Sequence, residues 1–197
     1  MYDQMGDRIL ALKYFQQGLE IRNQSKAPDL SRVASLTNVA SGYSAVGTMD
    51  EALKALDEAE EILSKQRFPQ IYYIAYLDDT RGKLYFKQGK IDKADELFMK
   101  AVRGREEVSY GKNTHVESLI NVMKVAVKKG DNYRCIKTGK TVLSFIDDVI
   151  KQSPKSHLLT ACYYCLASVY KAMGDDANVR DQGRSVEARI PVYMRLQ

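Results

Sequence analysis

Five glycines recur at a nearly constant interval, and this period constrains the fold of the chain more than any other feature. They are Gly6, Gly47, Gly89, Gly130 and Gly174, and successive members are separated by 41, 42, 41 and 44 residues. Each lies between two segments whose apolar residues recur at spacings of three and four, the pattern of one helix face. Glycine adopts the left-handed backbone that ends many helices at little cost. The period therefore predicts repeated helix pairs, each joined at a glycine.

The residues around each glycine repeat as well. After Gly89, the side chains of Ala94, Phe98 and Ala101 share one helix face. The corresponding residues after Gly47 are Ala52, Leu56 and Ala59, and those after Gly6 are Ala11, Phe15 and Gly18. A tyrosine precedes three of the glycines by four residues, at Tyr43, Tyr85 and Tyr170. We expect these tyrosines in the core, beside small residues where two helices approach closely.

The order Tyr-x3-Gly-x4-Ala-x3-Phe-x2-Ala from Tyr85 to Ala101 resembles the tetratricopeptide repeat signature, and Gly82 matches the family's small residue in the first helix. The match weakens in the last two repeats, where other residues stand at the signature positions: Cys135, Gly139 and Val142, then Val179, Gly183 and Val186. A period above 34 residues is similar to that of the kinesin-light-chain-like branch of the family. HEAT-type repeats share this longer period and are the alternative fold.

The resemblance implies an all-α, right-handed superhelical solenoid of antiparallel helix pairs with about 4.5 repeats. We expect one domain over residues 1–197, made of a half-repeat 1–28 and repeats 29–68, 69–110, 111–153 and 154–197. Expected helices span 7–23, 30–46, 49–66, 70–88, 91–107, 114–129, 132–152, 156–173 and 176–194. Capping boxes are predicted at Thr48–Glu51 and Thr114–Glu117.

The first predicted helix is the second member of a repeat, and too few residues precede it to form its partner. Terminal repeats normally carry a polar outer face. We therefore expect an uncovered apolar face on this helix, which indicates a fragment of a longer array; the alternative is a naturally degenerate first repeat. Self-association through this face is a further expectation.

Catalytic, metal and nucleotide motifs are weak in this sequence, so we predict neither an enzyme nor a bound metal or cofactor. Gly139-Lys140-Thr141 lacks the earlier glycine of a phosphate-binding loop and lies inside a predicted helix. Cys162-x-x-Cys165 is expected in mid-helix, where two thiols serve packing rather than redox chemistry. His115 and His157 fall in predicted first helical turns, with no nucleophile placed near them. The adjacent carboxylates, Asp78-Asp79, Asp147-Asp148 and Asp175-Asp176, are expected to be solvated.

Composition narrows the partners and the compartment. The net charge is +5 and the sequence pI about 9.0, which favours acidic partners without requiring nucleic acid. No apolar run reaches the roughly 18 residues of a membrane helix. Three cysteines are an odd number for a disulfide framework, so we expect free thiols and a cytoplasmic location.

A partner-binding surface is expected on the first helix of each pair, which lines the concave face of such arrays. Asn38 and Asn121 stand in Ser-Leu-x-Asn segments similar to the Leu-x-Asn element of kinesin-light-chain-like repeats. That resemblance implies that they clamp the backbone of an extended peptide. A lysine stripe on the same face favours an acidic peptide. The predicted partner-binding residues are Asn38, Ser41, Tyr76, Lys83, Lys87, Asn121, Lys124, Lys128, Tyr164 and Lys171; the same register places Thr37, Ser44, Asp79, Thr80, Glu117 and Ser168 on this face.

These residues leave several functions open. The first is a protein-interaction scaffold that holds an extended, acidic peptide in the groove. The alternative is a structural or regulatory module that packs on other domains of a larger signalling or sensor protein. RNA binding would use the lysines, with Tyr76 and Tyr164 for base stacking. The lysines can also be ordinary solvated charge.

Overall fold

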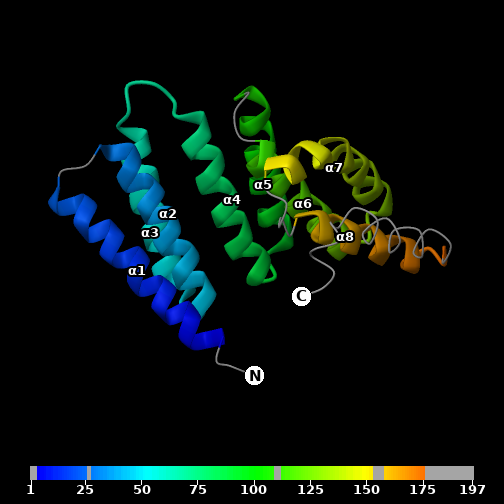
Figure 1. The fold of residues 1–197 in the computed structure, drawn as a ribbon, viewed down its shortest axis with the longest axis horizontal. Coiled ribbons are helices and arrows are strands. Elements are labelled where there is room, and N and C mark those ends of the chain that lie inside the picture. The colour runs from blue at the N-terminus through cyan, green and yellow to red at the C-terminus, as the bar shows by residue number, and fades with distance from the viewer. Residues whose placement is uncertain (1–3, 26–27, 109–111, 153–157, 176–197) are drawn as a thin grey trace. The chain divides into compact units, whose positions relative to one another are not determined.

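The computed structural model describes residues 4–25, 28–108, 112–152 and 158–175, and all regular elements among these residues are α-helices (Figure 1). In chain order they are α1 (Gln4–Gln24), α2 (Asp29–Val46), α3 (Met49–Ser64), α4 (Ile71–Lys87), α5 (Ile91–Glu107), α6 (Lys112–Lys129), α7 (Asn132–Gln152) and α8 (Leu158–Ala172). The bounds predicted for these helices are confirmed to within three residues. The predicted helix 176–194 lies outside the described residues.

The chain divides into two compact units, residues 1–108 and 109–197. Unit 1 holds α1 to α5, and unit 2 holds α6 to α8. The single domain with repeats at 29–68, 69–110, 111–153 and 154–197 stays a prediction. Among the described helices, none is long and apolar enough to span a membrane.

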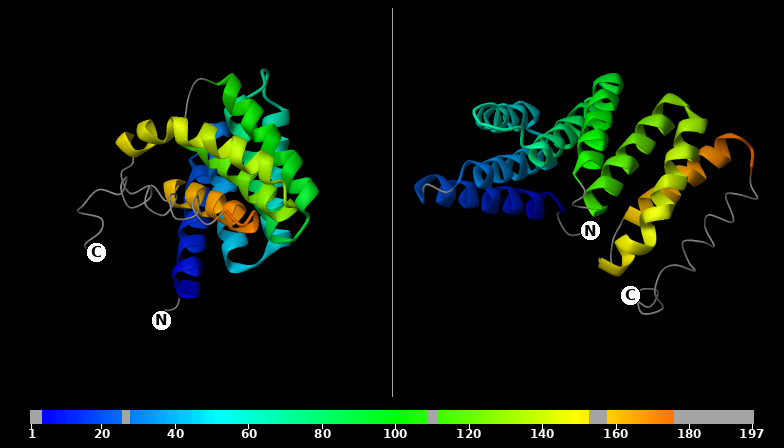
Figure 2. Two further views of the ribbon diagram at one scale, coloured as in Figure 1. Left: turned by 90° about the vertical axis from the view of Figure 1, so that its right-hand side faces the viewer. Right: turned by 90° about the horizontal axis from the view of Figure 1, so that it is seen from above.

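In unit 1, neighbouring helices pair in sequence order, α1 with α2, α2 with α3 and α4 with α5 (Figures 1 and 2). Helix α4 also packs on α2 and α3, which joins the second pair to the first. An ion-pair cluster strengthens this junction, because the Arg81 guanidinium of α4 contacts Asp57 at 2.7 Å and Glu60 at 2.8 Å on α3. The Arg81 side chain is 14% exposed, so these two contacts lie at the edge of the core.

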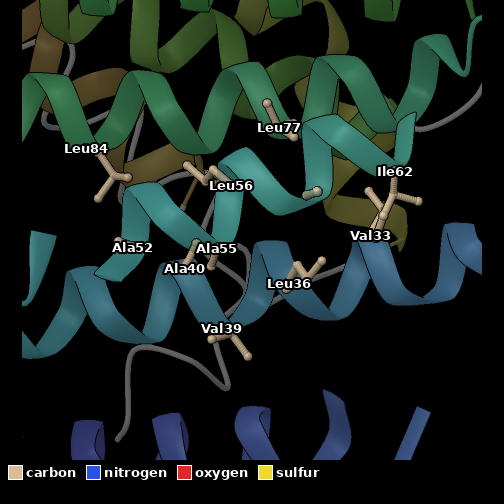
Figure 3. Packing of buried hydrophobic residues seen from close by; sticks show 11 residues of the cluster. Val33, Leu36, Val39, Ala40, Ala52, Ala55, Leu56, Ile62, Leu77 and Leu84 are labelled. Atoms are coloured by element: carbon tan, nitrogen blue, oxygen red, sulfur yellow. The ribbon is translucent and has the colours of Figure 1, made fainter. Parts of the chain in front are cut away.

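The core of unit 1 forms where apolar faces of α2, α3 and α4 meet (Figure 3). Helix α3 has its buried residues at spacings of three and four, and Ala52, Leu56 and Ala59 are fully buried. Figure 3 shows Leu36 and Ala40 of α2 on the side of α3, whereas Val39 extends toward α1. Alternating small and large side chains let these helices approach closely.

Left-handed glycines end four helices, as the period predicts. Gly47, Gly89, Gly130 and Gly174 have φ values of 96°, 74°, 69° and 71°. The amides of Gly47 and Thr48 both donate to the Tyr43 carbonyl at 3.0 Å, which closes the end of α2. The turn predicted at Gly6 is wrong, because Gly6 lies inside α1, which begins at Gln4.

Neither predicted capping box forms. Thr48 stands at the N-cap of α3, but its hydroxyl donates to the Tyr43 carbonyl at 3.2 Å instead of capping α3. In a capping box the Thr48 amide would donate to the Glu51 carboxylate, but this amide instead donates to the Tyr43 carbonyl at 3.0 Å. Thr114 is already inside α6, which begins at Lys112.

Unit 2 packs α6 against α7, and α8 contacts both. Its buried residues include Ile120, Met123 and Ala126 of α6 and Leu166 and Val169 of α8. Gly139 of α7 faces Leu166, and a Cβ atom at this glycine would lie 2.6 Å from a Leu166 methyl group. The close contact between α7 and α8 thus depends on the absence of a side chain at Gly139.

Among the described glycines of unit 1, Gly82 of α4 has the least space for a side chain, because the Phe98 ring of α5 packs against it. A Cβ atom at Gly82 would lie 2.7 and 2.8 Å from two carbons of the buried Phe98 ring. Similarly, a Cβ atom at Gly42 of α2 would lie 3.0 to 3.2 Å from atoms of Leu12 and Phe15 on α1. A Cβ atom at Gly82 is therefore incompatible with the present position of Phe98, whereas one at Gly42 would crowd Leu12 and Phe15 less severely.

We therefore expect Gly82→Ala to destabilise the protein by about 1–3 kcal/mol, because Phe98 must shift within a packed core. The matched control is Gly18→Ala on α1, where the nearest atom to the new Cβ is the end of the Arg22 side chain at 3.5 Å. This control should stabilise by about 0.5–1 kcal/mol, since alanine favours helix over glycine. Urea denaturation followed by circular dichroism measures both; equal effects would contradict the proposed close contact.

Candidate partner-binding surface

In unit 2, the predicted partner-binding residues lie on α6 and α8, two helices in direct contact. Lys124 and Lys128 of α6 and Lys171 of α8 are exposed. Tyr164 of α8 is 75% exposed, which leaves a large aromatic ring in solvent. The Lys124 ammonium also acts on the Cys165 thiol of α8, partly offsetting the rise in that thiol's pKa caused by burial. Lys124 therefore lies on the side of α6 that faces α8.

Asn121 lies beneath this surface rather than on it. Its side chain is 3% exposed, and the Lys124 ammonium donates to its Oδ1 at 3.3 Å. Because Asn121 is buried, its amide orients the exposed Lys124 side chain and is not itself accessible to a ligand. Asn38, at the same repeat position in unit 1, is half-buried and accepts a hydrogen bond from the Tyr76 hydroxyl at 3.0 Å.

In unit 1, the predicted partner-binding residues form bridges between α2 and α4. The bond from Tyr76 to Asn38 is one bridge. In the second, the Lys87 ammonium donates to the Ser44 hydroxyl at 2.9 Å and to the Ser44 carbonyl at 3.2 Å. Burial, and then the nearby Arg8, lower the pKa of Lys87. Ser41 is exposed, and its hydroxyl donates to the Thr37 carbonyl at 3.0 Å.

The carboxylate of Asp79 is buried, and the prediction that it is solvated is wrong. Asp79 is 1% exposed; its Oδ2 contacts the Lys83 ammonium at 2.8 Å, and its Oδ1 lies 3.8 Å from the Arg105 guanidinium. Arg105 itself is 5% exposed. The sequence signal was available, because Lys83 follows Asp79 by four residues, but the contribution of Arg105 from α5 could not be read from spacing.

Asp78 is also partly withdrawn from water. It lines an open cavity of about 300 Å³ between α4 and α5, together with Ile71, Ile74, Ala75, Lys100, Arg103, Gly104 and Glu107. Burial raises the pKa of Asp78 to about 6, although the cations Lys100 and Arg81 oppose this rise. For both members of this pair of adjacent carboxylates, the expectation of a solvated charge is therefore corrected.

Other residues expected on the inner face or in the core lie elsewhere. Thr37 and Thr80 are buried, and their hydroxyls donate to the carbonyls one turn earlier, at Val33 and Tyr76. Tyr43, Tyr85 and Tyr170, which were expected in the core, are half-buried at its edge. The Tyr43 hydroxyl accepts a hydrogen bond from Gln16 at 2.9 Å, and the ammonium groups of Lys90 and Lys93 lie over the Tyr85 ring.

The three thiols lie in the core of unit 2, and burial raises the pKa of both Cys135 and Cys162 to about 12. They are therefore poor nucleophiles at neutral pH. Gly139, of the Gly139-Lys140-Thr141 segment, is inside α7 and packed against Leu166, away from any phosphate-binding turn. The His115 ring packs edge-on against Phe145, and His157 lies outside the described residues.

Comparisons with known proteins agree with this helical-repeat architecture. The tetratricopeptide repeat family model matches residues 80–103, which cover the end of α4, the Gly89 turn and most of α5. The sequence matches no protein in the curated set.

Among solved structures, the chain resembles the nearly identical TPR-like repeats assigned to a kinesin light chain of Podosopora anserina. A point variant of that protein aligns with a TM-score of 0.66 at 19% identity, and the parent form with 0.64 at 19%. Both alignments cover 95% of this chain and 89% of the other. BtubC (BKLC) of P. vanneervenii aligns at a TM-score of 0.59 and 13% identity, over 95% of this chain and 91% of its own.

The resemblance to tetratricopeptide repeats inferred from sequence is thus confirmed, and the fold is an all-α helical repeat of this type. The HEAT alternative has no such support. At these identities, the likeness to the solved structures concerns the fold alone.

Asp78 provides a pH-dependent test of the geometry between α4 and α5. Its pKa in the folded protein lies above the usual aspartate value of 3.8, so the folded state binds the proton more tightly. The stability that protonation contributes is full below about pH 4 and lost as the pH rises through about 6. We expect Asp78→Asn to raise the melting temperature at about pH 7.5, with the gain shrinking toward pH 4.

The control for this experiment is Asp50→Asn, because Asp50 is exposed in the first turn of α3. This variant should not become more stable at neutral pH, since an acidic group at a helix N-terminus is favourable. A gain from Asp78→Asn that is the same at both pH values would contradict the burial of the Asp78 carboxylate.

Proposed function

We propose that this chain is a protein-binding scaffold and that α6 and α8 of unit 2 hold an extended, acidic segment of a partner protein. The exposed Tyr164 ring carries the proposal, because it stands on a pair of contacting helices that also expose Lys124, Lys128 and Lys171. An aromatic ring of this kind anchors a partner at low conformational cost. The three exposed lysines on the same two helices favour carboxylates and speed their capture.

Lys124 of unit 2 differs from its equivalent in unit 1, Lys83, in the residue that stands one helical turn before it. Lys83 has the carboxylate of Asp79 four residues before it and forms an ion pair with it. Lys124 occupies the same repeat position, but the residue four before it is Ile120, which is 1% exposed. An acidic ligand would therefore meet less competition from the protein's own carboxylates at Lys124 than at Lys83.

The predicted unit 1 residues keep a secondary place in this proposal. The Asn38 carbonyl is held by Tyr76, which leaves its amide nitrogen as the group able to donate to a peptide carbonyl. Ser41, with Lys83 and Lys87, extends the polar surface of α2 and α4. A ligand there would have to compete with the bridges that these side chains already form.

The class of repeat supports a binding role rather than catalysis, because solenoids offer the exposed face of their first helices to partners. A cytoplasmic location is part of the same proposal and is supported by three cysteines buried as free thiols. The alternative, a structural or regulatory module that packs on other domains of a larger protein, is favoured by the exposed apolar residues of α1.

The test uses short fluorescein-labelled peptides of alternating Glu and Ser, with Lys and Ser peptides as the charge control, in anisotropy titrations. We expect the acidic peptides to bind the whole chain and the double variant Lys124→Glu, Lys171→Glu to weaken this binding roughly tenfold or more. The matched control is Lys137→Glu, Lys140→Glu, which makes the same charge change at exposed positions of α7. Equal loss in both double variants would show nonspecific charge attraction and contradict a site on α6 and α8.

Tyr164→Ala separates anchoring from charge. Because Tyr164 is three-quarters exposed, its removal should leave the melting temperature nearly unchanged while weakening the acidic peptide about tenfold. Unchanged affinity would exclude an anchoring role for the ring. A labelled single-stranded RNA that binds more tightly than the peptides, with affinity falling steeply as salt rises, would favour the nucleic-acid alternative.

A further inference from the structure

Helix α1 carries apolar residues on two opposite faces, and α2 contacts one of them. On the inner face, Leu12 and Leu19 are half-buried against the unit 1 core, and Gln16 donates to the Tyr43 hydroxyl. On the outer face, Leu10, Tyr14 and Ile21 are 48%, 62% and 63% exposed. Figure 2 shows α1 at the edge of unit 1. Three large exposed apolar residues on one helix face mark an interaction site more often than isolated apolar residues do.

The outer face has a spacing that reads the same in both chain directions. Leu10, Tyr14, Gln17 and Ile21 follow one another at intervals of four, three and four residues. At about 100° per residue, they fall within one sector of the helix, and we call them the outer stripe. A second α1 running antiparallel would present the same intervals. Leu10 would then face the partner's Ile21, and Tyr14 would face the partner's Gln17.

The residues beside the outer stripe are complementary in charge and size between two antiparallel copies of α1. One edge carries Lys13 and Glu20, both exposed, and the other carries the small residues Ala11 and Gly18. In a twofold antiparallel pair, each edge of one helix meets the same edge of the other. Lys13 would therefore lie beside the partner's Glu20, and Glu20 beside the partner's Lys13. The small residues on the second edge would allow the two helices to approach closely.

We propose that the outer stripe of α1 is a homodimer interface in which two copies of this chain pair antiparallel through Leu10, Tyr14, Gln17 and Ile21. The proposal goes beyond the peptide-binding function and uses no residue of unit 2. In a parallel twofold pair, opposite edges of the two helices meet, so Lys13 and Glu20 would lie beside the partner's Ala11 and Gly18 and would form no ion pair across the interface; the charges therefore favour the antiparallel arrangement. A single helix pair buries less than a standard interface of about 800 Å² per partner, so we expect a dissociation constant in the micromolar range.

Sedimentation velocity over about 1 to 300 µM protein tests the association, because dimerisation depends on concentration. We expect a reversible monomer–dimer equilibrium for the whole chain and a dissociation constant raised at least tenfold by Tyr14→Lys, with the circular dichroism spectrum unchanged. Lys13→Glu should weaken the dimer several-fold. Adding Glu20→Lys to it should restore the dimer, because the pair is then reversed but still complementary.

Disulfide trapping tests the antiparallel register. A mixture of Leu10→Cys and Ile21→Cys chains should form an oxidised dimer, whereas Leu10→Cys alone should not, because its two cysteines would stand roughly 16 Å apart along the helices. Wild-type protein controls for the three buried cysteines. A monomer throughout the concentration range would overturn the proposal and assign the outer stripe to another protein segment. A dimer insensitive to Tyr14→Lys, trapping of Leu10→Cys with itself, or failure of the charge exchange to restore association would also overturn it.

Discussion

Three of the helix contacts among the described residues depend on a glycine that faces a large side chain across the contact. Phe98 of α5 lies against Gly82 of α4, Leu12 and Phe15 of α1 against Gly42 of α2, and Leu166 of α8 against Gly139 of α7. Dispersion contacts of this kind are lost over gaps of less than 1 Å, so a methyl group at the glycine changes the distance between the helices. The exposed faces of the helices keep their relative positions because these contacts hold.

This dependence explains why so much of the fold could be predicted from the sequence. Glycines at helix ends and small residues at helix contacts both recur with the period, and they predicted the described helices to within three residues. The errors occurred where a local pattern had a competing partner in the folded chain. The Thr48 hydroxyl bonds to the end of α2 rather than to α3, and Gly6 lies inside α1 instead of ending a helix.

The candidate site was less predictable than the fold. The repeat register determines the position of a residue on its helix, but it does not determine which side chains of other helices that residue contacts. Asn38 and Asn121 share a repeat position, yet one accepts a bond from Tyr76 of another helix and the other from Lys124 of its own. Asp79 was expected to be exposed because aspartate usually is, whereas Arg105 from α5 makes its burial tolerable. Spacing within one helix carries no information about a residue contributed by the next.

One repeat position shows how a common scaffold acquires different surfaces. Thr37, Asp79, Ile120 and Tyr164 are equivalent in the repeat register. In α2 the Thr37 hydroxyl donates to a backbone carbonyl, and in α6 the residue is the apolar Ile120; both side chains are buried. In α4 the carboxylate offsets the charge of Lys83, whereas in α8 an aromatic ring extends into solvent. The same repeat position therefore holds a buried side chain in α2, α4 and α6 and an exposed aromatic ring in α8. Repeat register alone therefore does not determine which of these side chains reaches the surface, because Tyr164 of unit 2 is exposed where Thr37 and Asp79 of unit 1 are buried.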